Sequence, residues 1–429
     1  MHAQPAAVLL AEQSDEISTL LHWCYQRRVP VTCRGRGTGT TGGSVPLLGG
    51  VVLSLERMQR IIDFDPANRT MTVEPGVINS AVQSLAATAG LFWPPDPTSR
   101  DACTIGGNLA CNAAGARAVK YGTPRENTLG LRAVDGRGRS LRCGCYTTKG
   151  VVGYDLTRLL IGSEGTLAVI TEATLKLHPL AAARRTLRLS YDTIHSAATA
   201  VTRIMGQPII PYTLEMMDKR AIAMVRDRYP LGLPANTGAL LLVEVEGSVE
   251  SLDAAVAAVI TAGSVSGLLE QLEPHTQAEI DRLWQTRKVL SPTLRQIAPK
   301  KINEDVVVPI TAIPDLIEGL AQIEATYHLP IVNFGHAGNG NIHVNLLIDS
   351  DDVAQMQRAE VALSEIFTLV LSLKGTLSGE HGVGRSKRDY ISRELDPVSL
   401  DLMWAIKNQF DPAHILNPEK SLPYQTPLN

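Results

Sequence analysis

Aromatic residues are scarce in this chain and make up only 4% of its 429 residues. That scarcity disfavours a surface on which nucleic-acid bases stack. The formal net charge of −3 argues against a protein that holds nucleic acid through a basic surface. No apolar run reaches the length of about 18 residues that a transmembrane helix needs. We therefore expect no nucleic-acid partner and no transmembrane helix.

Cysteine is also sparse, and its six residues form no Cys-x-x-Cys pair. This spacing excludes a zinc ribbon and a ferredoxin-type cluster. The N-terminus has no basic segment before its short apolar run, so we expect no signal peptide. The sequence predicts a reduced, cytoplasmic protein of two or three domains. Peripheral association with the inner face of the membrane and a homodimer both stay open.

Glycine and threonine dominate one short stretch, residues 34–43, which reads RGRGTGTTGG. Apolar segments at 29–33 and 51–55 flank it and are expected to be strands. Glycines let a ligand approach the main chain, and consecutive N–H groups beside hydroxyls make an anion-binding nest. No helix opens directly on the glycines and no Gly-Lys-Ser/Thr follows, which excludes the Rossmann and Walker loops. We interpret the stretch as a diphosphate cradle; a merely flexible loop is the alternative.

A second polar stretch, residues 93–115, reads WPPDPTSRDACTIGGNLACNAAG. It has no amphipathic period, and most of its polar groups are amides or hydroxyls that suit neutral hydrogen bonding. Taken alone, an ordinary Pro/Gly loop is the better interpretation. When the first glycine loop is taken into account, a second ligand-binding loop becomes the better interpretation of residues 93–115.

Histidines and carboxylates gather in two glycine-rich turns further along the chain. Apolar segments on both sides of residues 335–340 predict a hairpin, which can bring His336 and His343 together, with Asn345 on the face of His343. Glu380 and His381 stand in a later turn, after a long helix expected near 353–373. Two histidines and a carboxylate with an open fourth position form a catalytic-metal set. The alternative is that these histidines only satisfy buried hydrogen bonds.

The remaining segments indicate the organisation of the chain. Residues 6–10 are expected to be a strand, and Ser14 to cap the helix that follows. Segments 60–65 and 70–74 predict a hairpin, and 159–171 a strand-like pair interrupted at 162–165. The run 181–185 predicts a domain junction, after which strands (185–191, 238–246) alternate with amphipathic helices (193–205, 250–262).

Several of these motifs resemble one family. Residues 34–43 are similar to the first FAD-pyrophosphate loop of the vanillyl-alcohol-oxidase-type, or PCMH-type, flavoproteins. The stretches GSEGTLAVIT (162–171), GHAGNGNIHVN (335–345), GEHGVG (379–384) and LNPEK (416–420) resemble the branch of FAD-linked 2-hydroxy-acid dehydrogenases. That branch includes D-lactate dehydrogenase, the FAD subunit of glycolate oxidase and D-2-hydroxyglutarate dehydrogenase. Four positions depart from the family pattern: Arg36, Ala114, Asn339 and Glu419.

The resemblance implies an α+β fold. It consists of a PCMH-type FAD-binding domain built of two α/β subdomains, and an α+β cap domain with an antiparallel sheet. By this reading residues 1–180 form the FAD-binding domain, residues 181–400 form the cap that holds substrate and metal, and residues 401–429 return to the FAD-binding domain.

The resemblance also implies roles for individual residues. The metal ligands would be His336, His343 and Glu380, the base His381, and the substrate contacts Arg287, Ser291 and Asn345. Either Lys300 or Lys301 would face the substrate, and the sequence does not choose between them. The residues that contact FAD would be Arg34, Gly35, Arg36, Gly37, Thr38, Gly39, Thr40, Gly43, Pro95, Asp96, Thr98, Ser99, Gly106, Asn108, Asn112, Gly115, Glu164, Gly165, Ile170 and Asn417.

The implied activity is FAD-dependent oxidation of a small D-2-hydroxy acid to the 2-oxo acid. Candidate substrates are D-lactate, glycolate and D-2-hydroxyglutarate, and a divalent Zn or Mn ion would assist. No histidine lies in 30–43 or 93–115, so we expect FAD to be held non-covalently. The electron acceptor would be a quinone, a cytochrome, an electron-transfer flavoprotein or a sister subunit. Two alternatives are a non-redox flavin enzyme of the alkylglycerone-phosphate synthase type and an FAD-binding accessory subunit of a larger oxidase complex.

Overall fold

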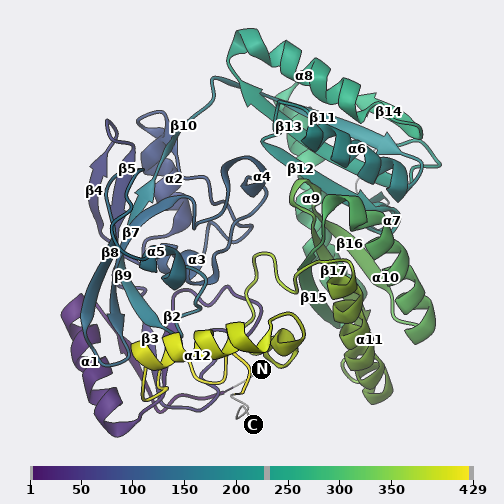
Figure 1. Ribbon diagram of the computed structural model, residues 1–429. Helices are drawn as coiled ribbons and strands as arrows, with labels where there is room; N and C mark the ends of the chain where they lie inside the picture. Colours follow the sequence, from purple (N-terminus) through teal and green to yellow (C-terminus); the bar gives the residue numbers. More distant parts are fainter. Residues whose placement is uncertain (1–2, 227–231, 425–429) are drawn as a thin grey trace. The chain divides into compact units, whose positions relative to one another are not determined.

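The computed structural model describes residues 3–226 and 232–424 and divides the chain into two compact units. The first unit comprises Met1–Leu180 together with Glu380–Asn429, and the second comprises Ala181–Gly379 (Figure 1). The sequence predicted a return to the first domain at residue 401, whereas in the structure the return begins at Glu380. The Gly-Glu-His turn is therefore where the chain passes from the second unit back into the first.

The first unit contains two main sheets and short helices. Its elements, in chain order, are β1 (Ala7–Leu10), α1 (Ser14–Arg27), β2 (Val31–Arg34), β3 (Val51–Ser54), β4 (Ile61–Asp65), β5 (Thr70–Val73), α2 (Asn79–Ala87), β6 (Leu91–Phe92), α3 (Ile105–Cys111), α4 (Ala118–Tyr121), β7 (Thr128–Asp135), β8 (Ser140–Gly144), α5 (Leu156–Leu160), β9 (Ala168–Lys176), β10 (His178–Pro179), the 3₁₀ helix η3 (Arg388–Arg393) and α12 (Pro397–Phe410).

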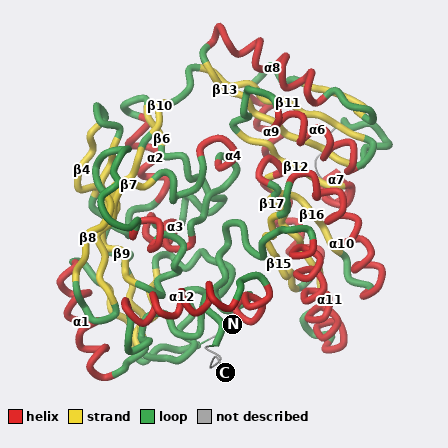
Figure 2. The backbone as a smooth tube through the Cα atoms, in the orientation of Figure 1, coloured by secondary structure: helices red, strands yellow, loops and turns green. Residues whose placement is uncertain are grey.

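A parallel three-stranded sheet of order β1-β3-β2 leads directly into the first glycine loop. A five-stranded antiparallel sheet, β4-β5-β9-β7-β8, forms the other layer, and β6 pairs with β10. Val134 and Val169 of the large sheet share a core with Ile17 of α1 and Leu53 of β3. The two sheets thus enclose a common core. A long loop at 35–50 follows β2 and another at 93–103 follows β6; loops are drawn in green in Figure 2.

Two local predictions differ from the structure. Gln13, not Ser14, is the N-cap of α1, because Gln13 and Glu16 form a reciprocal capping box. The apolar run 159–161 was expected to be a strand, but α5 occupies Leu156–Leu160. Asp155 starts that helix by accepting the N–H of Arg158 at 3.0 Å. A short apolar run does not by itself distinguish a strand from a buried helical turn.

The second unit contains one large sheet with helices on both faces. Its elements are β11 (Ala183–Tyr191), α6 (Ile194–Gly206), β12 (Thr213–Asp218), α7 (Lys219–Arg226), β13 (Ala239–Gly247), α8 (Val249–Gly263), β14 (Leu268–Leu272), α9 (Gln277–Ile297), β15 (Lys300–Val307), η1 (Ile310–Ala312), α10 (Ile313–Tyr327), β16 (Ile331–His336), η2 (Ala337–Asn339), β17 (Asn341–Ile348) and α11 (Val353–Ser372).

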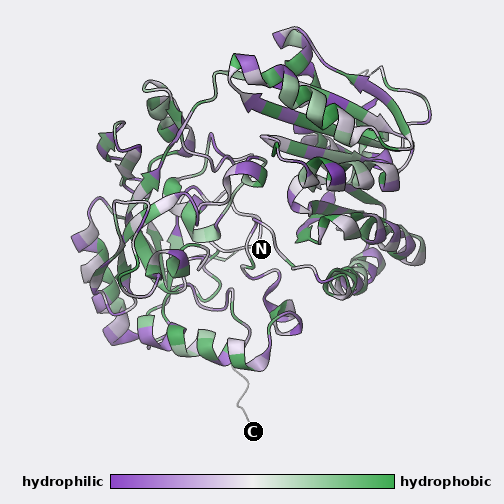
Figure 3. Ribbon diagram, turned by 45° about the horizontal axis from the view of Figure 1, so that its top comes forward, coloured by the Kyte–Doolittle hydropathy of each residue, from purple (hydrophilic) through white to green (hydrophobic). Residues whose placement is uncertain are grey.

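The strand order is β14-β11-β13-β12-β16-β17-β15, and every neighbouring pair is antiparallel. This confirms the predicted α+β fold with an antiparallel sheet. Helices α6, α8, α10 and α11 pack on one face of the sheet, and α7 and α9 pack on the other. In Figure 3 the helices carry both hydrophobic and hydrophilic residues. This is expected for a helix that packs one face on a sheet and exposes the other face to solvent. We call the side covered by α7 and α9 the α9 face.

No helix within residues 3–226 and 232–424 combines the length and hydropathy that crossing a lipid bilayer requires.

Candidate functional site

The first glycine loop presents main-chain donors. Within the described part of the chain, the N–H groups of residues 35–44 donate no hydrogen bond to another protein group. The space beside Gly39 is open, with no atom within 4 Å of where a Cβ would stand. Arg36 is directed toward Glu56, at 3.6 Å. A run of unpartnered N–H groups beside an open glycine fits an anionic ligand such as a diphosphate.

The far end of this loop is fastened by the C-terminal segment. The Asn417 side-chain N–H₂ donates to the carbonyl oxygens of Gly43 at 2.9 Å and Glu164 at 2.6 Å. The Lys420 ammonium in turn donates to the Asn417 side-chain oxygen at 2.7 Å. Asn417 therefore joins the first loop to the turn at 162–165, where Gly165 lies.

The second polar stretch is held largely by its own side chains. Asp96 pairs with Arg100 at 2.9 Å and Arg117 at 3.0 Å. The Asn108 side-chain oxygen accepts from Asn79 at 2.7 Å. The Asn112 side-chain oxygen accepts from the Arg125 N–H at 3.2 Å.

The remaining predicted positions of this stretch lie in its backbone turns and on a neighbouring strand. Pro95 accepts a hydrogen bond from Asn79 at 3.1 Å, and Gly106 donates to Pro75 at 2.8 Å. Ser99 accepts the N–H of Cys103 at 2.8 Å, and Thr98 lies in the same turn. Ile170 is buried on β9 opposite Ala133. Asp96, Asn108 and Asn112 thus give the stretch its shape.

Glu164 is buried and holds the turn at residues 381–384. This contact was not predicted from the sequence. Its two carboxylate oxygens each accept one main-chain N–H, from Val383 and from Gly384, both at 2.8 Å. Burial raises the pKa of Glu164, although these hydrogen bonds act in the opposite direction. The Thr41 hydroxyl also donates to the carbonyl oxygen of His381 at 3.3 Å. Glu164 and Thr41 therefore fix the segment that carries His381 within the first unit.

Glycine is required at two positions of this turn. Gly382 has φ +82°, and a Cβ there would approach the Glu164 carboxyl carbon to 3.0 Å. Gly384 has φ +50°, and a Cβ there would overlap the carbonyl oxygen of Thr41. The glycines let the turn pass close to the groups that hold it.

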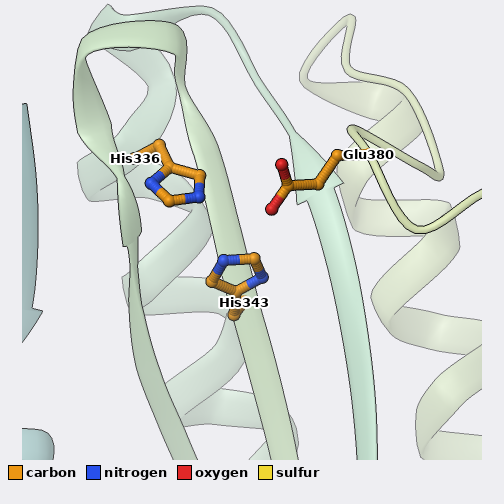
Figure 4. A group of neighbouring side chains, drawn as sticks. All are labelled: His336, His343 and Glu380. Carbon is orange, nitrogen blue, oxygen red and sulfur yellow. The ribbon is translucent and has the colours of Figure 1, made fainter. Parts of the chain in front are cut away.

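The predicted metal ligands come together. His336 ends β16 and His343 lies on β17, and their ring centroids are 5.2 Å apart. Ligand atoms of His336, His343 and Glu380 all lie within 4.8 Å of one another, and Figure 4 shows the carboxylate of Glu380 directed toward the two rings. Two imidazoles and one carboxylate are a donor set of the kind that holds a catalytic zinc ion.

The start of the Glu380 segment is fixed within the second unit. The fully buried Asp305 lies on β15 directly opposite His343. Its carboxylate accepts the Gly379 N–H at 3.0 Å and the Ser378 hydroxyl at 3.2 Å. Glu380 is the next residue after this anchored glycine, so Asp305 positions the third member of the group through one peptide bond.

Glu215 is a residue that the sequence reasoning missed. It lies on β12 with 2% of its surface exposed. One of its carboxylate oxygens accepts from the Arg287 Nε at 2.7 Å, and the other is in short contact with the His336 Nδ1. Burial alone would raise the pKa of Glu215, but the charges of His336 and Arg287 outweigh it and lower the pKa to about 2. The strand TLEMMD carries two buried acids, Glu215 and Asp218, and an acid within this otherwise apolar segment was the available signal.

The predicted substrate residues lie on the α9 face of the second unit. Arg287 and Ser291 are on α9, and the guanidinium carbon of Arg287 stands 4.7 Å from the centre of the Phe334 ring. The Lys301 ammonium donates to the Ser291 hydroxyl at 2.9 Å, whereas Lys300 reaches the Met356 sulfur, 3.6 Å away. Successive strand residues point to opposite faces, so only Lys301 shares this face.

Asn345 contributes a buried acceptor. It is fully buried, and its side-chain N–H₂ donates to the carbonyl oxygens of Val332 at 3.1 Å and His343 at 3.0 Å. Its side-chain oxygen has no hydrogen-bond partner among the described residues. A buried acceptor without a partner is costly unless a ligand satisfies it.

Comparisons with known proteins identify the family of the chain. Residues 5–144 match the family described as FAD binding domain, and residues 180–421 match FAD linked oxidases, C-terminal domain. The chain is 39% identical over 418 residues to the glycolate oxidase subunit GlcD of Bacillus subtilis, covering 97% of this chain and 89% of that protein. It is 32% identical over 430 residues to a D-lactate dehydrogenase of Anaerostipes hadrus, covering 97% and 90%.

Solved structures show the same fold. A p-cresol methylhydroxylase structure superposes with a TM-score of 0.78 at 16% identity, covering 98% of this chain and 90% of that one. This confirms the PCMH-type architecture expected from the glycine loops.

Proposed function

Because the chain belongs to the family of FAD-linked oxidases, we infer that it oxidises small 2-hydroxy acids with FAD as cofactor. We propose further that a divalent ion, Zn²⁺ or Mn²⁺, assists the reaction and that the substrate is the D enantiomer. The observation that carries the metal assignment is the convergence of His336, His343 and Glu380 within 4.8 Å.

The substrate carboxylate is assigned to Arg287. Its guanidinium is bound through Nε to Glu215 and lies over Phe334, so its two terminal nitrogens form the fork that suits a carboxylate. Lys301 supplies a second positive charge on the same face, next to Ser291. Asn345 is also assigned to the substrate, because its buried side-chain oxygen is an acceptor that no described residue satisfies.

Proton removal is assigned to His381. A neutral imidazole accepts the hydroxyl proton as the bond from C2 to hydrogen breaks and the carbonyl of the 2-oxo acid forms. The turn that carries His381 is held by Thr41 and Glu164, which limits the positions that the imidazole can take. A divalent ion held by His336, His343 and Glu380 would supply a Lewis acid that makes this proton easier to remove.

FAD, when bound, would supply the acceptor for the hydride of C2. The donors of residues 35–44 would hold its diphosphate, and the C-terminal Asn417 would keep that loop in place. The two electrons taken from the substrate must then leave the protein. Since the Bacillus relative is named as a subunit of glycolate oxidase, we propose a sister subunit as the first electron acceptor.

Anaerobic flavin bleaching tests this function. The purified protein would be mixed without oxygen with D-lactate, L-lactate, glycolate, D-malate and D-2-hydroxyglutarate, and the flavin absorbance followed. We expect bleaching by at least one D-2-hydroxy acid or by glycolate, and bleaching slowed about 10²–10⁴-fold in His381→Ala with FAD still bound. An oxidised flavin that persists with every acid would refute the assignment.

A further inference from the structure

Glu215 connects two groups that serve different parts of the substrate. It lies in the middle of the sheet, on β12 between β13 and β16. One oxygen is bound to Arg287, which is 72 residues away, and the other to His336, 121 residues away. All three residues belong to the second unit. One buried carboxylate therefore touches both the proposed carboxylate clamp and a proposed metal ligand.

The contact with His336 selects the nitrogen that the imidazole can offer to an ion. Since Nδ1 is engaged by Glu215, Nε2 is left as the ligand atom. A carboxylate that accepts the other ring N–H fixes the tautomer and orientation of a metal-binding histidine and raises its basicity. Glu215 thus determines which way the ring of His336 is turned.

The contact with Arg287 fixes the guanidinium plane. Nε donates to Glu215 at 2.7 Å while the guanidinium carbon lies 4.7 Å from the centre of the Phe334 ring. A planar group held at one edge and on one face has little freedom to rotate. The edge opposite to these contacts carries the two terminal nitrogens, which can bind a carboxylate through two hydrogen bonds.

We propose that Glu215 is a positioning residue that couples the substrate clamp to the metal site by holding Arg287 and His336 with one carboxylate. The proposal rests on the proposed function, because it assigns a metal to His336 and a substrate carboxylate to Arg287. Its consequence is that a change at Glu215 alters metal affinity and substrate affinity together, whereas a change at Arg287 alters substrate affinity alone.

The chain offers a matched control in Glu244. This carboxylate is also buried, lies on the neighbouring strand β13 and is bound to the same helix, accepting from the Trp284 indole at 2.8 Å and from Thr186 at 3.0 Å. It contacts neither Arg287 nor His336 among the described interactions. Glu244→Gln therefore reports the effect of perturbing a buried acid under α9 without touching the proposed coupling.

The experiment compares Glu215→Ala, Glu215→Gln, Arg287→Lys and Glu244→Gln in FAD-loaded protein. Zn²⁺ and Mn²⁺ affinities would be measured by competition with a chelator, and KM by flavin reduction with the best acid of the panel. For Glu215→Ala we expect about 10- to 100-fold weaker metal binding and roughly tenfold higher KM. Arg287→Lys should raise KM alone, and Glu244→Gln should change neither quantity.

Glu215→Gln keeps the side-chain volume and a single acceptor oxygen, so it should fold readily and lose at least one of the two contacts. A folded Glu215→Ala with parental metal affinity and KM would overturn the proposal. If Glu215→Ala fails to fold, the same parental values in Glu215→Gln would overturn it.

A separate measurement distinguishes failure of the coupling from failure of the proposed function. Nitrogen NMR of histidine-labelled, metal-free protein reports the protonated ring nitrogen of His336, identified by its loss in His336→Gln. We expect Nδ1 to carry a proton in the parent. A ring protonated only at Nε2 would overturn the positioning role even in an active enzyme. A protein that binds no ion and bleaches with no acid would instead refute the proposed function, while the NMR result would still decide the role of Glu215.

Discussion

Replacement of Glu164 should loosen the turn that carries His381. In the structure one carboxylate oxygen accepts the Val383 N–H and the other accepts the Gly384 N–H, both at 2.8 Å. Glutamine keeps one acceptor oxygen, but its N–H₂ group then faces the other main-chain N–H, so one of the two hydrogen bonds is lost. Because a hydrogen bond to a charged group contributes about 1.5–3 kcal/mol, we expect Glu164→Gln to destabilise the turn by about that amount. Glu164→Ala removes both contacts and should have roughly twice the effect.

Hydrogen exchange measured by mass spectrometry gives the local readout. A loss of about 1.5–3 kcal/mol should speed exchange of the amides in a peptide covering 380–386 about 10- to 100-fold in Glu164→Gln. FAD should stay bound, and flavin reduction by substrate should slow because His381 is less well positioned. Residue 164 has φ +52°, and glutamine and alanine both carry a Cβ as glutamate does. The backbone strain at this position is therefore the same in both variants and in the parent.

Glu172→Gln is the matched control. Glu172 lies on the following strand β9, and its carboxylate accepts from Arg132 at 3.3 Å, away from the turn. We expect parental exchange and parental flavin reduction in this variant. If the 380–386 peptide exchanged at the parental rate in Glu164→Ala, the reasoning that Glu164 holds the turn would be refuted.

Four further predictions concern the cofactor, Arg287, the candidate metal group and the buried His178. The purified protein should be yellow and release FAD on acid denaturation; flavin that stays with the precipitate would contradict non-covalent binding. Arg287→Lys should lower kcat/KM for 2-hydroxy acids about 10- to 100-fold because lysine lacks the planar fork, and unchanged kinetics would remove Arg287 from the site. His343→Ala should lose the divalent ion but keep FAD, whereas His381→Ala should keep both and reduce flavin about 10²–10⁴-fold more slowly; metal analysis in which His381→Ala loses the ion while Glu380→Ala retains it would reverse the two roles. Burial lowers the pKa of His178 to about 4 from its usual 6.5, so folding favours the neutral ring and stability should fall as pH drops from about 6.5 toward 4. Urea unfolding at about pH 7 and about pH 5 should show a smaller loss in His178→Gln than in the parent, and equal losses would contradict this.

Features carried by consecutive residues were predictable from the sequence. The glycine loop at 34–43 was expected because five glycines and three threonines in ten residues cannot form a core. In the structure the N–H groups of residues 35–43 have no protein partner among the described residues. The hairpin that brings His336 close to His343 was expected because glycines interrupt two apolar segments. Such patterns act within a few residues and need no knowledge of the rest of the chain.

Contacts between distant residues were not predictable in the same way. Glu215 meets partners 72 and 121 residues away, and Glu164 meets amides more than two hundred residues away. No local pattern marks either pairing, because each depends on which strands become neighbours. The choice between Lys300 and Lys301 likewise required the register of β15 against β17, which places Lys301 opposite Leu347 on the α9 face. The boundary at Glu380 was missed because the anchoring of the turn by Glu164 is a tertiary contact.

The order of segments along the chain has a consequence for synthesis. Ile415 and Leu416 complete the core formed by Ile17, Leu21 and Leu53, and the Val31 N–H bonds to Ile415 at 2.8 Å. Ribosomes add about 5–20 residues per second, so on the order of tens of seconds pass between emergence of the first segment and of its last partner. At the end of that interval the second unit has all of its residues, whereas the first unit still exposes an unfinished core. The N-terminal segment of the growing polypeptide should therefore be the most vulnerable to proteases and to aggregation. Chaperones that recognise exposed apolar surface should bind to this segment.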